Sequence, residues 1–266
     1  MRKFSFLFAL LIITACTKNN SVEFLKTSQV QLVQPTLELS NQLIDSFVVL
    51  RAELAYPNTE IRYTTDNSEP NQNSKLYTSK FKIDSPSTFK FKAFHSKLLT
   101  SETVVTSIKK KGLSIDKIEW ISSASHQYNG SGENTLTNHE KGSLNFGDKQ
   151  WLGFNSKAHG KVFFDKLTKI ASVDIGYLSG PSSWIFPPRS IKISTSKDGK
   201  IFNQKEVVEI EPLNDFENAS IKSIIIPVNE KVIAIELEIE NESQIPSWHE
   251  GKGKKGWLFM DEWIFN

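Results

Sequence analysis

The sequence predicts an all-β protein built from two β-sandwiches in series. After residue 34, no stretch keeps apolar residues at helical spacing for about twelve residues. Alternation with a period of two recurs instead. Phe89, Phe91 and Ala93 alternate with lysines, and the apolar residues of 233–239 alternate with Ala234 and glutamates. Clusters of Asn, Asp, Gly, Ser and Pro separate these segments, which is typical of antiparallel sandwiches.

Composition and charge narrow the range of functions. The chain has 266 residues, a formal net charge of +2 and a single cysteine. An intrachain disulfide framework and a cysteine-based zinc site each need at least two thiols, so both are excluded. The small net charge gives no sign of a nucleic-acid binder, so nucleic acid is not an expected partner.

The N-terminus has the pattern of a secretion signal. Arg2 and Lys3 precede residues 4–13, which are apolar apart from one serine, and a small residue precedes Cys16. This order is typical of a signal peptide, and the apolar run is shorter than the roughly 20 residues of a spanning helix. Residues 13–16 also resemble the lipobox of bacterial lipoproteins, which implies lipidation of the cysteine. The alternative is an ordinary signal peptide with a chance cysteine.

Lipidation would place the protein in the bacterial cell envelope. Residues 1–15 would be a lipoprotein signal peptide, and acyl chains on Cys16 would hold the mature chain to a membrane. We expect the outer membrane or the cell surface, although the sequence leaves open which side the protein faces. Residues 16–34 are polar and aperiodic, so we interpret them as a tether between the anchor and the folded part.

A charge run marks the predicted boundary between the two sandwiches. Residues 109–111 are lysines followed by Gly112, and we interpret this run as a solvated connection. The first sandwich is therefore expected at residues 35–109 and the second at residues 114–266.

The first region carries a motif at residues 61–70, Ile-Arg-Tyr-Thr-Thr-Asp-Asn-Ser-Glu-Pro, followed by the strand pattern of residues 89–94. This order resembles the small Ig-like domain that ends chitobiases and β-hexosaminidases or serves them as an accessory domain. Asn67 stands where that family usually has glycine, but asparagine tolerates a positive φ. We interpret Asp66 and Glu69 as parts of a turn and not as catalytic acids.

The second region combines Tyr-Asn-Gly-Ser-Gly at 128–132, Ser-Thr-Ser-Lys-Asp-Gly at 194–199 and an aromatic segment at 257–263. This succession resembles a discoidin-like (coagulation factor V/VIII type C) jelly roll, in the variant that often ends bacterial family 20 glycosidases. The resemblance implies a jelly-roll β-sandwich. The barrel that carries catalysis in those glycosidases has no counterpart in this sequence.

No residue pattern predicts an enzyme. The sequence lacks a Gly-x-Ser-x-Gly elbow, a Walker loop and a His-Glu-x-x-His motif. Asp261 and Glu262 are adjacent, but neighbours in a strand point to opposite faces and cannot act together on one bond. We therefore expect no catalytic residue and no required cofactor.

Aromatic residues in loops are the best candidates for binding. A flat ring can stack on the apolar face of a sugar while nearby polar groups bond its hydroxyls. Trp184 lies between Gly180-Pro181-Ser182-Ser183 and two prolines, and Trp248 precedes a glycine-rich run at 251–256 that we interpret as flexible. We predict both tryptophans as stacking platforms, with four polar neighbours: His249, Arg189, Tyr128 and His126. The alternative is that each tryptophan closes the end of the sandwich.

The remaining tryptophans lie within apolar strand patterns, and we expect them in the core: Trp120, Trp151, Trp257 and Trp263. The discoidin resemblance further implies a possible structural calcium held by Asn138, Glu140 and Glu262. Residues 138–139 read Asn-His where that family usually has Asp-Gly, so one charge is missing from the implied site.

The expected function is a non-catalytic, membrane-anchored lipoprotein that binds a glycan through its C-terminal discoidin-like domain. The alternative is a protein-interaction or structural module of the envelope that docks a partner enzyme or transporter. Both sandwich types serve either role, and the fold alone does not choose between them.

Overall fold

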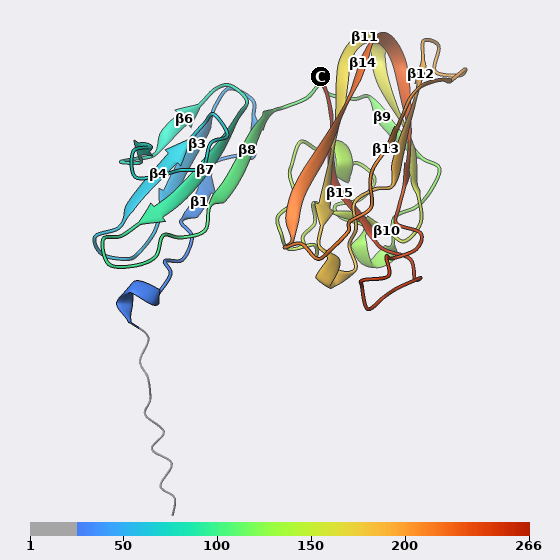
Figure 1. Cartoon of the computed structure of the whole chain (residues 1–266). Helices are drawn as coiled ribbons and strands as arrows, with labels where there is room; N and C mark the ends of the chain where they lie inside the picture. Colours follow the sequence, from blue (N-terminus) through green and yellow to red (C-terminus); the bar gives the residue numbers. More distant parts are fainter. Residues whose placement is uncertain (1–25) are drawn as a thin grey trace, which may run out of the picture.

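The computed structural model describes residues 26–266. Figure 1 shows two β-rich bodies joined by a short connection. The elements run in the order η1 (Thr27–Gln29), β1 (Thr36–Leu39), β2 (Leu43–Ile44), β3 (Val48–Glu53), β4 (Glu60–Thr64), β5 (Lys75–Leu76), β6 (Phe81–Ile83), β7 (Ser87–Phe94), β8 (Val104–Lys110), β9 (Lys117–Trp120), η2 (His126–Tyr128), η3 (Thr135–Thr137), β10 (Leu152–Phe154), β11 (Ala158–Ser179), η4 (Pro181–Ser183), β12 (Ser190–Ser196), β13 (Asn203–Glu209), β14 (Ser220–Glu240) and β15 (Leu258–Phe265). The predicted all-β architecture is confirmed.

The first body is a sandwich of two small sheets. One sheet has the order β1-β3-β6 and the other β2-β8-β7-β4-β5. Alternate residues of β7 face the space between them, so Phe89, Phe91 and Ala93 are buried while Lys90 and Lys92 are not. The alternation that predicts this strand is therefore confirmed. Phe89 and Phe91 pack with aliphatic residues of β3 and β8 into one core.

The turn after β4 has the geometry expected from its sequence. Asn67 has a φ of 67°, which asparagine accommodates at little cost. Asp66 accepts hydrogen bonds from the Ser68 N–H and Oγ, and Glu69 bonds Lys90 and Thr103. Each acidic side chain thus holds the turn or its neighbours together.

The second body is a folded seven-stranded sheet with the order β10-β15-β11-β14-β12-β13, in which β9 also pairs with β11. Strands β11 and β14 are long and run through both layers. Their first and second halves belong to different layers because the register shifts between Phe163 and Thr168. β9 pairs with the start of β11, and β15 pairs with its end. The largest apolar core fills the space between these layers.

The corner in the second body changes one detail of the predicted core. Ile235, Leu237 and Ile239 are fully buried, as their alternation predicts, but Ile233 is half-buried and Val232 takes the interior position. The reason is the register shift opposite this point, which reverses the side-chain phase of the strand.

The four tryptophans that the sequence places in the core differ in how far they are buried. Trp151 and Trp263 are 1% exposed, whereas Trp120 and Trp257 are half-buried.

The predicted tether is partly folded. Cys16 and the signal peptide lie outside the described residues. Within the tether, Leu32 is buried, its N–H bonds the Leu99 carbonyl at 3.0 Å, and Gln31 bonds Glu102. Residues 26–34 are thus docked on the first sandwich, because an apolar side chain and its backbone both find partners there. Among residues 26–266, no helix has the length and apolar content that crossing a membrane requires.

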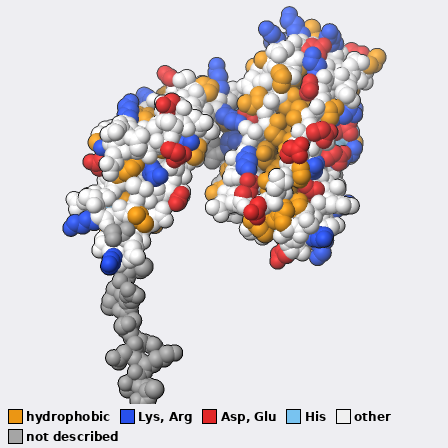
Figure 2. All heavy atoms as spheres, in the orientation of Figure 1, with side chains coloured by type: hydrophobic (Ala, Val, Ile, Leu, Met, Phe, Trp, Pro, Cys, Tyr) orange, Lys and Arg blue, Asp and Glu red, His pale blue; other side chains and the backbone are white. Residues whose placement is uncertain are grey.

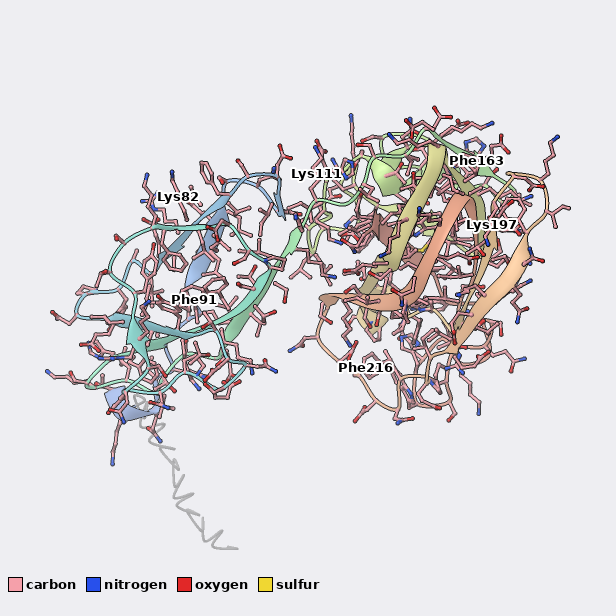
Figure 3. The ribbon with its side chains drawn as sticks, turned by 90° about the horizontal axis from the view of Figure 1, so that it is seen from above. Lys82, Phe91, Lys111, Phe163, Lys197 and Phe216 are labelled. Atoms are coloured by element: carbon pink, nitrogen blue, oxygen red, sulfur yellow. The ribbon has the colours of Figure 1, made fainter. Side chains whose placement is uncertain are left out.

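The lysine run between the bodies is less solvated than predicted. Lys111 lies on the connection (Figure 3), but Lys109 belongs to β8 and reaches across to Asp174 and Ser223 of the second sandwich. Gly112 lies so close to β15 that an added Cβ would approach the Phe265 backbone to 2.9 Å. The connection is therefore packed against the second body.

Candidate functional site

Three loops gather at one end of the second sandwich, opposite the chain's C-terminus (Figure 1). They connect β11 to β12, β13 to β14, and β14 to β15. Four aromatic rings surround a buried histidine there, and we call the five residues the aromatic cluster: Trp184, Phe186, Phe216, Trp248 and His249.

Trp184 has an unusual backbone. It follows η4 with φ 62° and ψ 23°, a left-handed conformation that bulky side chains rarely adopt. Hydrogen bonds on both sides hold it: its N–H donates to the Pro181 carbonyl, and its carbonyl accepts the Trp257 N–H, each at 2.8 Å. The indole ring is half-buried. The surrounding structure thus imposes a costly conformation on a ring that still reaches solvent.

His249 has a different role from the predicted one. It is 3% exposed. Its Nδ1 accepts the Gly251 N–H at 2.9 Å, and its Nε2 lies 2.9 Å from the Pro181 carbonyl, which can only accept. The ring is therefore the Nε2–H tautomer with both nitrogens used. It supports the rings around it and has no free polar atom for a ligand.

Trp248 fits the end-closing alternative better than the stacking one. Its Nε1–H donates to the Leu213 carbonyl at 2.9 Å, and its half-buried ring packs between Phe186 and Phe216. Phe216, by contrast, is 53% exposed and lies with its ring centroid 4.7 Å from that of Trp248. Figure 3 shows Phe216 on the loop that leads into β14. The tryptophan anchors the loop, and the phenylalanine presents the open surface.

Phe216 was not among the predicted site residues. The signal in the sequence is an aromatic residue inside the polar run Asn214-Asp215-Phe216-Glu217-Asn218. Such a ring has no strand pattern that would bury it.

The β14–β15 loop is more ordered than its glycines suggest. Gly251 is buried, and an added Cβ would lie 3.1 Å from both the His249 and the Trp184 rings. The Lys254 ammonium lies 5.1 Å from the centroid of the Trp184 ring, and Glu250 accepts the Trp184 Nε1–H at 3.3 Å. Lys254 and Glu250 are thus charged neighbours of Trp184 that the sequence pattern did not single out.

No described side-chain contact places the other three predicted neighbours in the aromatic cluster. Arg189 approaches Glu242 at 3.7 Å, and its Nη1 is buried without a hydrogen-bond partner. Tyr128 packs edge-on against Phe259 and Trp257 and reaches Trp184 only through the Trp257 backbone. His126 is exposed in η2, and no described contact joins it to either predicted tryptophan.

The residues implied as calcium ligands do not converge as calcium ligands do. The Asn138 Oδ1 accepts the Glu140 N–H at 2.8 Å, the Glu140 carboxylate bonds Gln150, and the Glu262 Oε1 accepts the His139 N–H at 3.2 Å. Calcium takes six to eight oxygens, but only one oxygen of this set, Glu262 Oε2, is buried and unpartnered. In the described part of the chain, no group of three or more His, Cys, Asp or Glu is placed to hold a metal ion. The donor set does not fit calcium.

Glu262 is instead an isolated buried carboxyl group. Its side chain is fully buried, and burial raises its pKa to about 8, against a smaller opposing effect of the His139 N–H and of Lys141. Lys141 is engaged with Asp261 at 2.7 Å. Burial lowers the pKa of His139, so the 3.7 Å approach of its ring to Glu262 is not an ion pair. Glu262 is therefore protonated at neutral pH.

Comparison with protein families identifies part of the chain. Residues 46–106 match the family model described as the chitobiase/β-hexosaminidase C-terminal domain. The matched segment lies within the first sandwich. The resemblance noted for the first sandwich is thereby confirmed, over less than half of the chain. No curated protein matches the chain significantly in sequence.

Several solved structures resemble parts of the chain. The C-terminal domain of a chitobiase from Bacteroides fragilis is 14% identical, with 58% of this chain and 96% of that chain covered and a TM-score of 0.36. A pectin-binding carbohydrate-binding module is 15% identical over 57% and 91%, with a TM-score of 0.35. A SusE-like protein is 13% identical over 88% and 97%, with a TM-score of 0.30.

Proposed function

We propose that the protein is a non-catalytic carbohydrate-binding protein, lipid-anchored in the bacterial cell envelope, and that it binds glycan at the loop end of its second sandwich. The aromatic cluster supports this proposal. Trp184 and Phe216 flank the buried His249 ring at 5.8 and 5.3 Å and both reach solvent. A sugar presents an apolar ring face edged by hydroxyl groups. The two aromatic rings can stack on that face, and the charged groups beside them can bond the hydroxyls.

The single observation that carries the proposal is the backbone of Trp184. A left-handed conformation costs about 1 kcal/mol or more for a residue with a Cβ, and a glycine would adopt it freely. A tryptophan that served only packing could occupy an unstrained position nearby. Strain of this kind clusters at binding sites, where the fold holds a side chain in place before the ligand arrives.

Replacement of Trp184 by glycine tests the site. We expect Trp184→Gly to weaken glycan binding at least about tenfold, which corresponds to ~1.4 kcal/mol. Phe216→Ala should have a similar effect. Trp184→Gly should change the free energy of unfolding by less than ~1.4 kcal/mol, the expected loss in binding free energy. The reason is that the relief of backbone strain offsets the loss of ring contacts. Isothermal titration calorimetry of the full chain with a broad glycan panel, together with urea unfolding, measures both quantities.

The matched control is Phe47→Ala. Phe47 is 44% exposed and lies under Lys82 in the first sandwich, so its removal takes away an exposed ring and a cation–π contact elsewhere. Its binding should equal that of the wild type. If no glycan in the panel binds, or if Trp184→Gly binds as tightly as the wild type, the proposed site is wrong.

The anchor is tested separately. Cys16→Ser should move the protein from the membrane fraction to the soluble fraction and abolish the incorporation of labelled palmitate in a bacterial host, because the thiol would be the attachment point. A serine variant that stays membrane-bound and labelled would contradict the anchor while leaving the glycan site untouched.

A further inference from the structure

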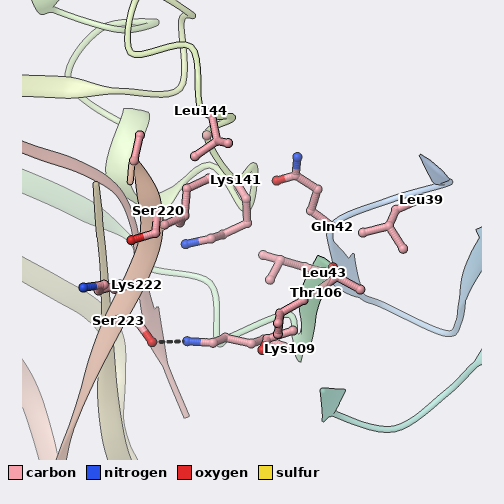
Figure 4. A pocket seen from close by; sticks show the side chains of 15 residues that line it. Leu39, Gln42, Leu43, Thr106, Lys109, Lys141, Leu144, Ser220, Lys222 and Ser223 are labelled. Carbon is pink, nitrogen blue, oxygen red and sulfur yellow. Dashed lines mark hydrogen bonds between the residues drawn. The ribbon is translucent and has the colours of Figure 1, made fainter. Parts of the chain in front are cut away.

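A groove lies between the two sandwiches, with a volume of about 550 Å³. Residues of β8 line one side, and the start of β14 and the loop at 141–144 line the other (Figure 4). The groove lies apart from the aromatic cluster, and none of its lining residues belongs to that cluster.

The start of β14 is a free strand edge. Residues 220–227 pair with β11 on one side. On the other side, β12 pairs only with residues 234–240. Within residues 26–266, the backbone N–H and C=O groups of residues 220–226 that point away from β11 therefore have no strand partner. Pro227 ends this stretch, and proline within sheets occurs on edges because it has no N–H to donate.

This edge lacks the protection that the opposite end of the same sheet has. β13 ends the sheet with Asn-Gln-Lys-Glu-Val-Val-Glu, a charged sequence of the kind that prevents pairing between edges. Residues 220–226 read Ser-Ile-Lys-Ser-Ile-Ile-Ile, with high β-propensity and one charge. A protein that keeps such an edge open beside a groove has a surface suited to strand addition.

The side chains around the edge define the chemistry of an incoming segment. Ile221, Ile225, Val105 and Leu144 are 37%, 63%, 53% and 58% exposed, so apolar side chains stand on both sides of the edge. Three lysines line the groove, Lys109, Lys141 and Lys222, and none of its lining residues is acidic. Each lysine already pairs with a carboxylate outside the lining: Lys109 with Asp174, Lys141 with Asp261 and Lys222 with Glu217, whose side chains are 5%, 0% and 29% exposed. The lysine charges are thus balanced, and an incoming segment meets mainly the apolar side chains and the backbone of the edge.

We propose that the groove binds an extended segment of a partner protein, which adds as a strand to the free edge at residues 220–226. Backbone hydrogen bonds supply the affinity, and alternating apolar side chains of the segment meet Ile221 and Val105. A polypeptide strand satisfies the repeated N–H and C=O groups of an edge, whereas a sugar lacks that repeat. This interaction is independent of glycan binding at the loop end.

The test uses a defined peptide. The probe is an acetylated and amidated nonapeptide in which valine alternates with threonine and glutamate. Titration into the full chain, followed by hydrogen exchange, should show saturable binding and slower exchange of the outward-pointing amides of residues 220–226. A second peptide with the same side chains, but with its alternate edge-facing amides N-methylated, should bind at least tenfold more weakly.

Two variants assign the binding to the groove. Val105→Lys, on the wall contributed by the first sandwich, should weaken the peptide at least fivefold, and Val207→Lys, on the exposed edge strand β13, should not. Equal affinities for the two peptides, unchanged exchange at 220–226, or no peptide binding would overturn the proposal. Protection of 220–226 that depends on protein concentration, without peptide, would also overturn it and assign the edge to a second copy of the chain.

Discussion

Glu262→Gln will stabilise the protein by about 4 to 5 kcal/mol at pH 8.5 and by less than about 1 kcal/mol at pH 5. The carboxyl group has an ordinary pKa of 4.5 in the unfolded chain and a pKa of about 8 in the folded one. Between these values the folded state binds the extra proton, so stability falls as the pH rises through this window. Glutamine has the same shape and never ionises. Urea unfolding from pH 5 to 9 should therefore give a flatter profile for the variant.

The control for this prediction is Glu119→Gln. Glu119 is exposed on β9 and pairs with a lysine, Lys117, so this variant should keep the wild-type slope between pH 5 and 8. A Glu262→Gln variant with the wild-type slope would show that the buried carboxyl group is ionised throughout. The same samples address calcium, which should not raise the melting temperature of the wild type at pH 8. A calcium-dependent rise that disappears in Glu262→Gln would restore the implied calcium site.

Lys109→Met will destabilise the second sandwich by about 3 kcal/mol, because it removes the ammonium that pairs with a carboxylate within that domain. The Asp174 side chain is 5% exposed, its Oδ2 bonds Lys109, and its Oδ1 has no partner. A buried carboxylate left without its cation bears the full cost of desolvation. Urea unfolding monitored by domain-specific hydrogen exchange should show the loss in residues 114–266 although the mutation lies in β8.

The double variant Lys109→Met/Asp174→Asn identifies the cause. An uncharged amide needs no cation, so the double variant should recover at least half of the lost stability. Lys110→Met serves as the matched control, since its side chain has no described ion pair across the connection. If Lys109→Met and Lys110→Met cost the same, the Lys109–Asp174 contact does not couple the two sandwiches.

Local patterns predicted most of the fold. The strand β7 and the second half of β14 have alternating residues whose buried face follows directly from the sequence, because one face of each strand packs on a core. The turn at Asn67 was equally predictable, since its side chain tolerates the required φ. Ile233 was not, because its exposure depends on a register shift in a strand about 70 residues away in the chain.

The candidate site was predicted less completely, for a similar reason. Loop composition pointed to Trp184 and Trp248, but it could not show that His249 is buried with both nitrogens bonded. Nor could it show that Phe216 joins the cluster from a different loop. Contacts among three loops depend on where the strands end in space, and side-chain spacing within one segment carries no information on that.

Under the proposed anchoring and glycan binding, the packed connection has a mechanical consequence. A ligand that pulls on the loop end would load the chain through residues 109–113 if the N-terminus is fixed. The Leu113 N–H donates to the Phe265 carbonyl at 2.7 Å, and this hydrogen bond clamps the connection to β15. Without the clamp, that load would reach β9, a four-residue strand that, in the described part of the chain, pairs only with β11. The clamp directs tension to β15, which lies between β10 and β11 inside the sheet. An interior strand must shear many hydrogen bonds at once, so the sandwich resists being peeled from its first strand.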